Sequence, residues 1–372
     1  MTICFISNKY PGAHNQSDYT FVKQLVDAIA EEGNECYVVA PYSVNHYRKF
    51  VRSKEQYAVG KGIVRVFRPW YLSFSSLSFL QGVSAFSRRR SLRRAFRMLP
   101  SVPDVVYGHF WQQAYEGFDY ARDHNLPLFV ATGESVVSLS VDKGADREAF
   151  CDYVKGVICV SSRNLEESIK LGLASADKCA VFPNSIDNGL FHRRDRQECR
   201  RQLNLPSDSI IAAFVGGFIE RKGPKRMAKA LEMSGGVRSV FIGKGDQLPQ
   251  CDGILFRGAL PHEKIPVYLS AADFFMLPTL NEGCCNAIVE ALACGLPVIS
   301  SNMPFNWDIL DETNSIMVDP TDTAEMALAI ARLRDDEGLR ARLSDGAIRK
   351  AETLTIDQRA KNILRFIKER MA

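Results

Sequence analysis

Short apolar runs alternate with amphipathic helical stretches along this chain, and this alternation restricts its fold more than any other feature. The first apolar runs cover residues 2–7 and 35–41, with a helical stretch over residues 20–32 between them. Strands that are apolar throughout are buried on both faces, as in a parallel sheet covered by helices. The pattern continues in this way to residue 182.

The pattern begins again after a polar segment rich in arginine, residues 183–209. A second series of strands and helices starts at residue 210, and the chain ends in an amphipathic stretch over residues 356–370. The sequence predicts an α/β fold of two Rossmann-like, doubly wound parallel-sheet domains facing a central cleft. The expected parts are residues 1–185, residues 186–350 and a C-terminal helix over residues 351–372.

Composition excludes several classes of protein. An apolar share of 46% and 22 phenylalanines exclude a disordered chain, and 372 residues suit two domains. A formal net charge of +4 is too balanced for a general nucleic-acid binder, so no nucleic acid is expected as a partner.

The ten cysteines are scattered and form no C-x-x-C pair, which excludes a zinc ribbon and a thioredoxin-type motif. We expect them to pack as small apolar residues in a reducing compartment. The N-terminus lacks a basic region and predicts a first strand rather than a signal peptide. No run of 18 apolar residues is present to span a membrane. The expected location is the cytoplasm.

One segment breaks the charge balance. Residues 48–99 carry 13 lysines or arginines against one acidic residue, Glu55. Apolar residues of the expected helix tend to one side, namely Phe79, Val83, Phe86, Leu92, Phe96 and Leu99. A basic helix with aromatic residues favours contact with an anionic membrane surface, which we expect through residues 70–97 at the inner face of the cytoplasmic membrane. The alternative is a helix packed on its own sheet with a solvated arginine face.

The most informative stretch covers residues 278–301, where Glu282 and Glu290 are separated by seven residues. Gly283 lets the loop turn closely, and a helix is expected from Cys285 to Gly295. The unpaired N–H groups of its first turn suit a phosphate. Glu290, roughly 8 Å further along the helix, would then reach the ribose of a bound nucleotide, because a carboxylate accepts from both ribose hydroxyls.

A second strand–loop–helix unit covers residues 215–224. Gly216 and Gly217 allow a ligand to approach closely, and Arg221 and Lys222 bring cations to the same edge of the sheet. A leaving nucleotide diphosphate develops negative charge that fixed cations can stabilise. Because the chain has no D-x-D pair to chelate a metal, no metal site is predicted. The alternative for this stretch is a solvated turn.

These residues resemble a known family, the retaining family 4 glycosyltransferases of the GT-B fold and the glycosyl transferases group 1 type. The family's E-x7-E motif and the G-x-P-V that follows are matched from Glu282 to Val298, and its strand–loop–helix "VGR…KG" is echoed by residues 215–223. Weaker echoes cover residues 103–109, 183–191 and 241–245.

The resemblance implies a role for each matched residue. Lys222 would contact the donor diphosphate, Glu290 would hold the ribose, and Glu282 would contact hydroxyls of the transferred sugar. The reaction would retain the anomeric configuration through a front-face displacement aided by the leaving phosphate, without metal or other cofactor. The C-terminal helix would cross back to the N-terminal domain, which would hold the acceptor. The other donor-binding candidates are Gly216, Gly217, Gly243, Arg257, Gly283, Cys284, Cys285 and Asn286.

The sequence departs from the family's pattern in places. Gly217 stands where the family often has Arg, and we infer that Arg221 supplies that charge as a third catalytic candidate. Thr132 replaces a His that elsewhere touches donor or acceptor. The acceptor-binding candidates are Gly12, His109, Thr132 and Glu134.

Several candidates also have a purely structural interpretation. His109 is equally consistent with polar packing, and Glu134 with capping of the next segment. We expect packing rather than nucleophilic chemistry for Cys284 and Cys285. The remaining histidines show no metal spacing and are expected at the surface or in caps, namely His14, His46, His124, His192 and His262.

The predicted function is metal-independent transfer of a sugar from a UDP- or GDP-sugar to a lipid-linked or polysaccharide acceptor in cell-surface glycan biosynthesis. One alternative is another enzyme class on the same fold, such as a sugar-nucleotide epimerase or a phosphorylase. The other is a non-catalytic protein that binds nucleotide sugars, consistent with Gly217 and Thr132. Base, sugar and acceptor leave too little trace in one sequence to be named.

Overall fold

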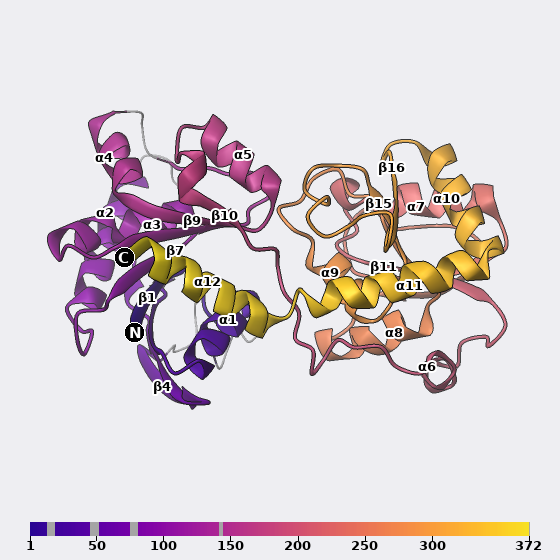
Figure 1. Cartoon of the computed structure of the whole chain (residues 1–372), viewed down its shortest axis with the longest axis horizontal. Helices are drawn as coiled ribbons and strands as arrows, with labels where there is room; N and C mark the ends of the chain where they lie inside the picture. The colour runs from indigo at the N-terminus through magenta and orange to yellow at the C-terminus, as the bar shows by residue number, and fades with distance from the viewer. Residues whose placement is uncertain (13–18, 45–51, 75–80, 141–143, 372) are drawn as a thin grey trace. The chain divides into compact units, whose positions relative to one another are not determined.

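The computed structural model describes residues 1–12, 19–44, 52–74, 81–140 and 144–371, and the chain divides into two compact units (Figure 1). Unit 1 comprises Met1–Val160, Asn164–Phe182 and Ile356–Ala372. Unit 2 comprises Ser161–Arg163 and Pro183–Thr355. The last helix begins at Ile356 rather than at residue 351.

Unit 1 contains an eight-stranded sheet in the order β10-β9-β8-β7-β1-β2-β5-β4. Its pairs are parallel except β4–β5, which is antiparallel and closes one edge. The strands are β1 (Thr2–Ile6), β2 (Glu35–Val39), β4 (Lys54–Val59), β5 (Gly62–Phe67), β7 (Val105–His109), β8 (Leu128–Thr132), β9 (Val154–Cys159) and β10 (Cys179–Val181). Two short strands pair separately, β3 (Tyr42–Ser43) and β6 (Trp70–Tyr71).

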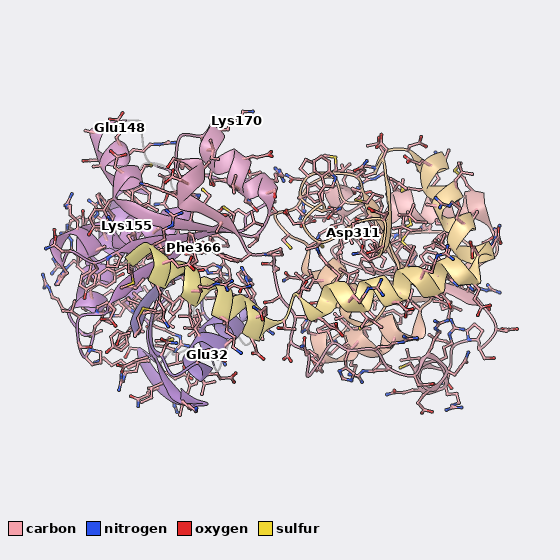
Figure 2. All side chains as sticks on the ribbon, viewed as in Figure 1. Glu32, Glu148, Lys155, Lys170, Asp311 and Phe366 are labelled. Atoms are coloured by element: carbon pink, nitrogen blue, oxygen red, sulfur yellow. The ribbon has the colours of Figure 1, made fainter. Side chains whose placement is uncertain are left out.

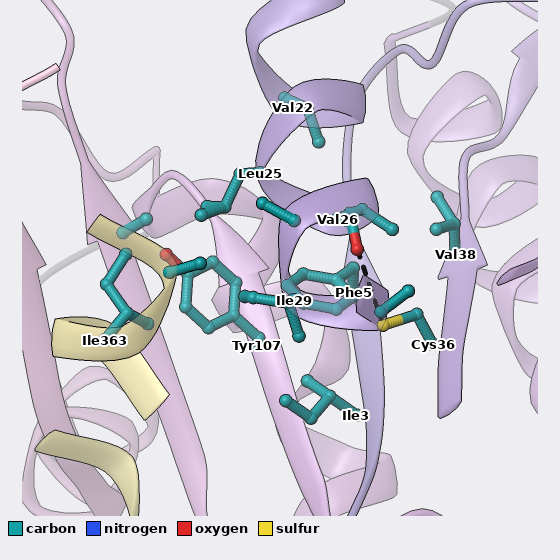
Figure 3. Close-up of a cluster of buried hydrophobic side chains, with 14 of the residues drawn as sticks. Ile3, Phe5, Val22, Leu25, Val26, Ile29, Cys36, Val38, Tyr107 and Ile363 are labelled. Carbon is teal, nitrogen blue, oxygen red and sulfur yellow. Dashed lines mark hydrogen bonds between the residues drawn. The ribbon is translucent and has the colours of Figure 1, made fainter. Parts of the chain in front are cut away.

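Helices cover both faces of this sheet, as buried apolar strands require. Side chains alternate across β1, so that Ile3 and Phe5 enter one core cluster and Cys4 and Ile6 enter the other. Figure 3 shows the first cluster, where the Cys36 thiol also contacts a carbonyl oxygen of the neighbouring helix. The helices are α1 (Thr20–Glu31), α2 (Gln81–Phe96), α3 (Trp111–Asp123), α4 (Ala145–Tyr153), α5 (Ser162–Lys170) and α12 (Ile356–Met371).

Helix α12 supplies part of the unit 1 core although it ends the chain. Ile363 and Ile367 are fully buried in the cluster that contains β1 and α1. Phe366, labelled in Figure 2, contacts the rings of Phe129 and Phe182. Unit 1 is therefore completed by the last residues of the chain.

The basic segment divides into several elements, and the expectation of one apolar side on its helix is wrong. Leu92 and Phe96 of α2 are buried in the unit 1 core, whereas Val83 and Phe86 are exposed. The difference arises because only the second half of α2 packs on the sheet. Phe79 lies outside the described residues. Within the described part of the chain, no helix has both the length and the apolar character needed to cross a bilayer.

Unit 2 contains a six-stranded parallel sheet in the order β13-β12-β11-β14-β15-β16. Its strands are β11 (Ile210–Val215), β12 (Val237–Ile242), β13 (Ile254–Gly258), β14 (Phe274–Leu277), β15 (Val298–Ser301) and β16 (Ser315–Val318). Its helices are α6 (Arg196–Leu203), α7 (Pro224–Ser234), α8 (Ile265–Ala271), α9 (Asn286–Ala293), α10 (Thr323–Asp335) and α11 (Glu337–Glu352).

The polar segment rich in arginine, residues 183–209, contains α6. Asp195 caps this helix by accepting a hydrogen bond from the Glu198 amide. Arg200 is buried and contacts Asp273 with a distance of 2.7 Å, so α6 is anchored inside unit 2. Asp273 also accepts from the Ile211 amide at 2.7 Å, which extends the connection to β11.

Candidate active site

Two loops of unit 2 meet at the carboxyl edge of its sheet. Strands β11 and β14 are neighbours in a parallel sheet, so the loops after them lie at the same edge. The first loop contains η3 (Glu220–Lys222), a 3-10 turn before α7, and the second precedes α9. The Leu280 amide donates to the Arg221 carbonyl at 2.8 Å and joins the two loops.

Glu282 collects three donors on one oxygen. Its Oε1 accepts from Arg221 Nη1 at 2.5 Å, Lys222 Nζ at 2.6 Å and Thr279 Oγ1 at 2.9 Å. Glu282 and Lys222 are largely buried, and Arg221 is more open. The structure thus brings the three catalytic candidates into contact. The group keeps one positive charge in excess, which suits an anionic ligand.

The charge state of Lys222 follows from its neighbours. Burial lowers the pKa of Lys222, but the neighbouring Cys285 and Glu282 outweigh burial and raise the pKa. Cys285 lies 3.6 Å from Lys222 Nζ, yet burial raises the pKa of its thiol. Because that thiol stays neutral near pH 7, Glu282 supplies the negative charge and Lys222 remains a cation.

The glycines at this edge have different reasons to be glycine. A Cβ on Gly243 would lie 1.9 Å from the Gly216 carbonyl oxygen, so Gly243 lets two strand ends pack together. A Cβ on Gly217 would meet nothing closer than 3.9 Å, so open space lies beside it. Gly283 does not adopt the left-handed conformation, so the backbone conformation of its turn does not require glycine.

Helix α9 begins at the same loop, with Cys285 at the N-cap and no side-chain hydrogen bond capping its first turn. Gly295 ends it in the left-handed conformation, with φ of +75°, as the sequence predicts. Glu290 lies just over one turn into α9. Its side chain is 13% exposed and accepts from His262 Nε2 at 3.0 Å.

His262 is a residue that sequence reasoning missed. It belongs to η4 (His262–Lys264), a 3-10 turn between β13 and α8, and is exposed as the sequence predicts, but its contact with Glu290 is not predicted. The hydrogen bond that His262 donates to Glu290 raises the pKa of His262, with further negative charge from Glu263 and Asp187. The sequence did contain a signal for this role: His262 follows a predicted strand of unit 2, and the carboxyl ends of parallel strands meet at the same edge of the sheet.

The other donor-binding candidates are only partly assembled. Asn286 Oδ1 accepts from Asn184 Nδ2 at 2.7 Å, and the same amide donates to the Cys284 carbonyl at 3.0 Å. Cys284 and Cys285 are buried beside this contact. Arg257 instead donates to the Pro249 carbonyl at 2.8 Å and is not brought to Glu282 or Glu290 by any contact of the described residues.

The acceptor-binding candidates lie at the carboxyl edge of the unit 1 sheet. His109 ends β7, and Thr132 ends the neighbouring β8. Burial lowers the pKa of His109 to about 3, aided by the charge of Arg359, so the imidazole is neutral near pH 7. Its Nδ1 is buried without a hydrogen-bond partner among the described residues. An orphan polar atom of this kind is consistent with a ligand-binding role as well as with strained packing.

Glu134 folds back on its own strand end. Its Oε2 accepts from Thr132 Oγ1 at 2.7 Å and from the Gly133 amide at 2.9 Å. Gly12 lies against the guanidinium of Arg68, which donates to the Pro11 carbonyl at 2.7 Å. Residues 13–18, with His14, lie outside the described residues, as does His46.

Among the described residues, no three His, Cys, Asp or Glu side chains lie close enough together to hold a metal ion. Arg221 and Lys222 are cations of the chain itself that contact Glu282 in the candidate donor site.

Comparison with known families decides the class of this protein. Residues 195–350 match the family described as Glycosyl transferases group 1, which covers nearly all of unit 2. The C-terminal unit is a group 1 glycosyltransferase domain. The predicted group 1 type is confirmed for this unit, and the predicted transferase class is confirmed.

Relatives of this glycosyltransferase extend over most of the chain. It is 24% identical to the Bacillus subtilis (strain 168) protein named "Putative teichuronic acid biosynthesis glycosyltransferase TuaC", over 93% of this chain and 92% of that protein. It is 26% identical to a D-inositol 3-phosphate glycosyltransferase of Acidothermus cellulolyticus, over 73% of this chain and 68% of the relative.

Solved structures establish the fold of this glycosyltransferase. A sucrose-phosphate synthase from Thermosynechococcus elongatus superposes with a TM-score of 0.77 at 20% identity, covering 99% of this chain and 98% of the other. Anabaena HepE, solved in complex with UDP, superposes with a TM-score of 0.73 at 16% identity, covering 99% and 100%. The predicted GT-B architecture of two Rossmann-like units is confirmed.

Proposed function

We propose that this glycosyltransferase moves a hexose from a UDP- or GDP-sugar to a lipid-linked or polysaccharide acceptor, with retention of configuration and without a metal. The observation that carries the proposal is the contact of Arg221 and Lys222 with Glu282 beside the first turn of α9. Fixed cations and the N-terminus of a helix stabilise a leaving diphosphate in the way that a metal does elsewhere.

Each residue of the site has a step to perform. The bond between the sugar C1 and the phosphate oxygen breaks, the acceptor oxygen bonds to C1 on the same face, and the acceptor proton passes to the leaving phosphate. Lys222 and Arg221 stabilise the charge that develops on that phosphate. All three donors to Glu282 use Oε1, which leaves Oε2 to accept from hydroxyls of the transferred sugar. Glu290 accepts from the ribose.

The names of similar proteins support the donor and the pathway class. Anabaena HepE has been solved with UDP and with UDP-glucose, and the Bacillus subtilis relative is named for teichuronic acid biosynthesis. These names and the residues of the site both fit a family 4 enzyme of cell-surface polysaccharide biosynthesis.

Unit 1 adds a membrane-facing surface to the proposal. Phe86 of α2 is 68% exposed, Val83 beside it is also exposed, and Trp70 is half exposed. Arg89 and Arg90 of the same helix are exposed as well. Exposed aromatic residues beside arginines favour peripheral binding to anionic lipid, here at the cytoplasmic face of the membrane. The buried second half of α2 takes no part in this contact.

Nucleotide binding tests the donor site. UDP, GDP and ADP are titrated without metal into the wild type, Glu290→Ala and Lys222→Ala, with Lys225→Ala as the control for an exposed lysine of α7. We expect one nucleotide to bind the wild type and Lys225→Ala alike, and both site variants to bind at least tenfold more weakly. Absence of binding by every nucleotide would contradict the proposal.

Donor turnover then separates the enzyme classes. With the matching sugar nucleotide, Lys222→Ala and Glu282→Ala should lose release of the nucleoside diphosphate and transfer to added acceptor lipid. Conversion of the sugar nucleotide without an acceptor would indicate an epimerase, and a requirement for inorganic phosphate would indicate a phosphorylase. A wild type that binds but turns over no donor would be a non-catalytic relative.

Vesicle binding tests the membrane surface. The wild type should sediment with phosphatidylglycerol vesicles at low salt and be released by salt, because screening weakens the arginine contacts. Phe86→Ser should weaken sedimentation, and Leu328→Ser, which alters an equally exposed leucine of α10, should not. Equal sedimentation of both variants would remove this surface from the proposal.

A further inference from the structure

The carboxylate of Glu290 is held by a neighbour from a different part of unit 2. His262 Nε2 lies 3.0 Å from Glu290 Oε1, and the two side chains are 53% and 13% exposed. A carboxylate buried to this extent needs hydrogen-bond donors to remain ionised. Among the described residues, His262 is the side chain that donates such a hydrogen bond to Glu290.

His262 is in turn held by the segment that connects to unit 2, residues 183–191. Phe191 is buried, and its ring centroid lies 5.1 Å from that of His262. Asp187 builds the turn that places Phe191, because its side chain accepts from the Gly189 amide at 2.9 Å and its carbonyl from the Phe191 amide at 2.8 Å. Asp187 therefore shapes the turn, and Phe191 packs against the ring of His262.

The same segment reaches the start of α9. The Asn184 amide group donates to the Cys284 carbonyl and to Asn286 Oδ1, at the helix end expected to face the diphosphate. One continuous segment therefore contacts the first turn of α9 through Asn184 and, through Phe191 and His262, the carboxylate one turn further on.

We propose that His262 is the positioning residue for Glu290 and that Phe191 fixes His262, so that this pair sets the affinity for the ribose of the donor. The inference rests on the proposed role of Glu290. A carboxylate has two oxygens and about four acceptor directions. The hydrogen bond from His262 uses one direction on Oε1 and stops rotation of the group. The other directions then stay aimed at the two hydroxyls of the ribose.

The charges around His262 add a dependence on pH. Glu290 on α9, Glu263 on η4 and Asp187 in the connecting segment act on it as acids, and Lys264 is the neighbouring cation on η4. Because the acids raise its pKa, His262 holds its proton to higher pH than an ordinary histidine. A protonated His262 adds positive charge beside the carboxylate expected to hold the ribose and so favours the anionic nucleotide, and nucleotide binding should therefore weaken as pH rises through that pKa.

The experiment uses the full chain and a pair of nucleotides that differ by one hydroxyl. Whichever of UDP, GDP and ADP binds the wild type is titrated together with its 2′-deoxy form, and the ratio of the two dissociation constants is recorded. The variants are His262→Ala, His262→Gln, Phe191→Leu and Glu290→Ala. His192→Gln is the matched control, because His192 is an exposed histidine that directly follows Phe191.

We expect the wild type and His192→Gln to prefer the ribonucleotide by about tenfold or more, the value of a hydrogen bond to a charged group. Glu290→Ala should bring the ratio close to one. His262→Ala and Phe191→Leu should lower it several-fold. His262→Gln should keep most of the ratio, because its amide still donates, and should lose the pH dependence between pH 6 and 9.

Comparison with the wild type at each pH removes the titration of the nucleotide phosphate itself. If no nucleotide binds the wild type, the proposed function and this inference both fail. If Glu290→Ala abolishes the preference while His262→Ala keeps both the ratio and the pH profile of the wild type, the proposed function stands and this inference is wrong.

Discussion

At the scale of single residues, His109 shows how burial decides chemistry. It ends β7 among aromatic rings, with the Phe110 and Phe21 centroids 4.8 and 5.3 Å away. In this setting the charged imidazolium is strongly disfavoured, and the pKa of His109 falls to about 3. A neutral, buried imidazole can hold a ligand hydroxyl, but it does not act as a cation near pH 7.

His109 should make unit 1 sensitive to acid. The unfolded chain binds a proton at His109 below about pH 6.5, and the folded chain does so only near pH 3. The free energy of unfolding should therefore fall with decreasing pH in this window, by up to about 1.4 kcal/mol per pH unit. Urea unfolding from pH 7.5 to 4.5 measures this slope. His109→Phe should flatten it, and His124→Gln, at an exposed site, should not. Equal slopes would show that other groups are responsible.

Two glycines of unit 2 should respond in opposite ways to alanine. Gly243→Ala places a Cβ against the Gly216 carbonyl and should lower the free energy of unfolding. Gly217→Ala has room for the Cβ and should leave folding unchanged while weakening nucleotide binding, because it fills the space beside the expected diphosphate. Thermal unfolding and nucleotide titration of both variants separate the effects. Unchanged binding by a folded Gly217→Ala would place the nucleotide elsewhere.

At the scale of elements, α6 shows how one buried ion pair ties a helix to a sheet. Arg200 contacts Asp273 and also donates to the Ala271 carbonyl at 2.9 Å. Asp273 precedes β14, whose carboxyl end leads into the loop that carries Glu282. The pair therefore anchors α6 beside the strand on which the candidate site depends.

Removing Arg200 from its ion pair with Asp273 should lower the free energy of unfolding substantially. Arg200→Ala leaves Asp273 buried with less compensation, and we expect a loss of about 3–5 kcal/mol in the free energy of unfolding. Arg196→Ala is the matched control on the same helix, because Arg196 contacts the same carboxylate but is half exposed. Its loss should stay near or below about 1 kcal/mol. Chemical denaturation of the full chain measures both, and similar losses would contradict the assignment.

At the scale of the whole molecule, the chain leaves unit 1 near residue 182 and returns to it at residue 356. The return places α12 against α1, where it buries Ile363 and Ile367. Because the core of unit 1 needs α12 as well as the strands before residue 182, unit 1 cannot complete its folding before residues 356–371 are available.

Substitutions in α12 should therefore destabilise unit 1 although they lie far from it in sequence. Ile363→Ala should cost about 2–5 kcal/mol, as for other large-to-small changes in a core. Lys361→Ala removes only an exposed contact with Glu32 and should cost less than about 1 kcal/mol. Protection of the β1 amides in hydrogen exchange reports unit 1 directly. Unchanged protection in Ile363→Ala would show that α12 is dispensable.

Much of the architecture follows from local pattern. Alternating apolar runs predict the parallel strands, and the E-x7-E spacing with Gly295 predicts the loop, helix and stop of α9. Strands β4 and β5 were not predicted, because basic residues interrupt their alternation of more buried and less buried side chains. The exposure of Phe86 was not predicted either, because it depends on which half of α2 packs on the sheet.

Short-range spacing and residue type are enough to predict the fold class, the glycosyltransferase class, and the candidate carboxylates and cations. Tertiary structure decided which side chains share a hydrogen bond. Arg221, Lys222 and Glu282 converge on one oxygen, and His262 reaches Glu290, because parallel strands bring loops distant in sequence to one edge. No local sequence pattern predicts these hydrogen bonds, since the side chains come together only when the sheet forms.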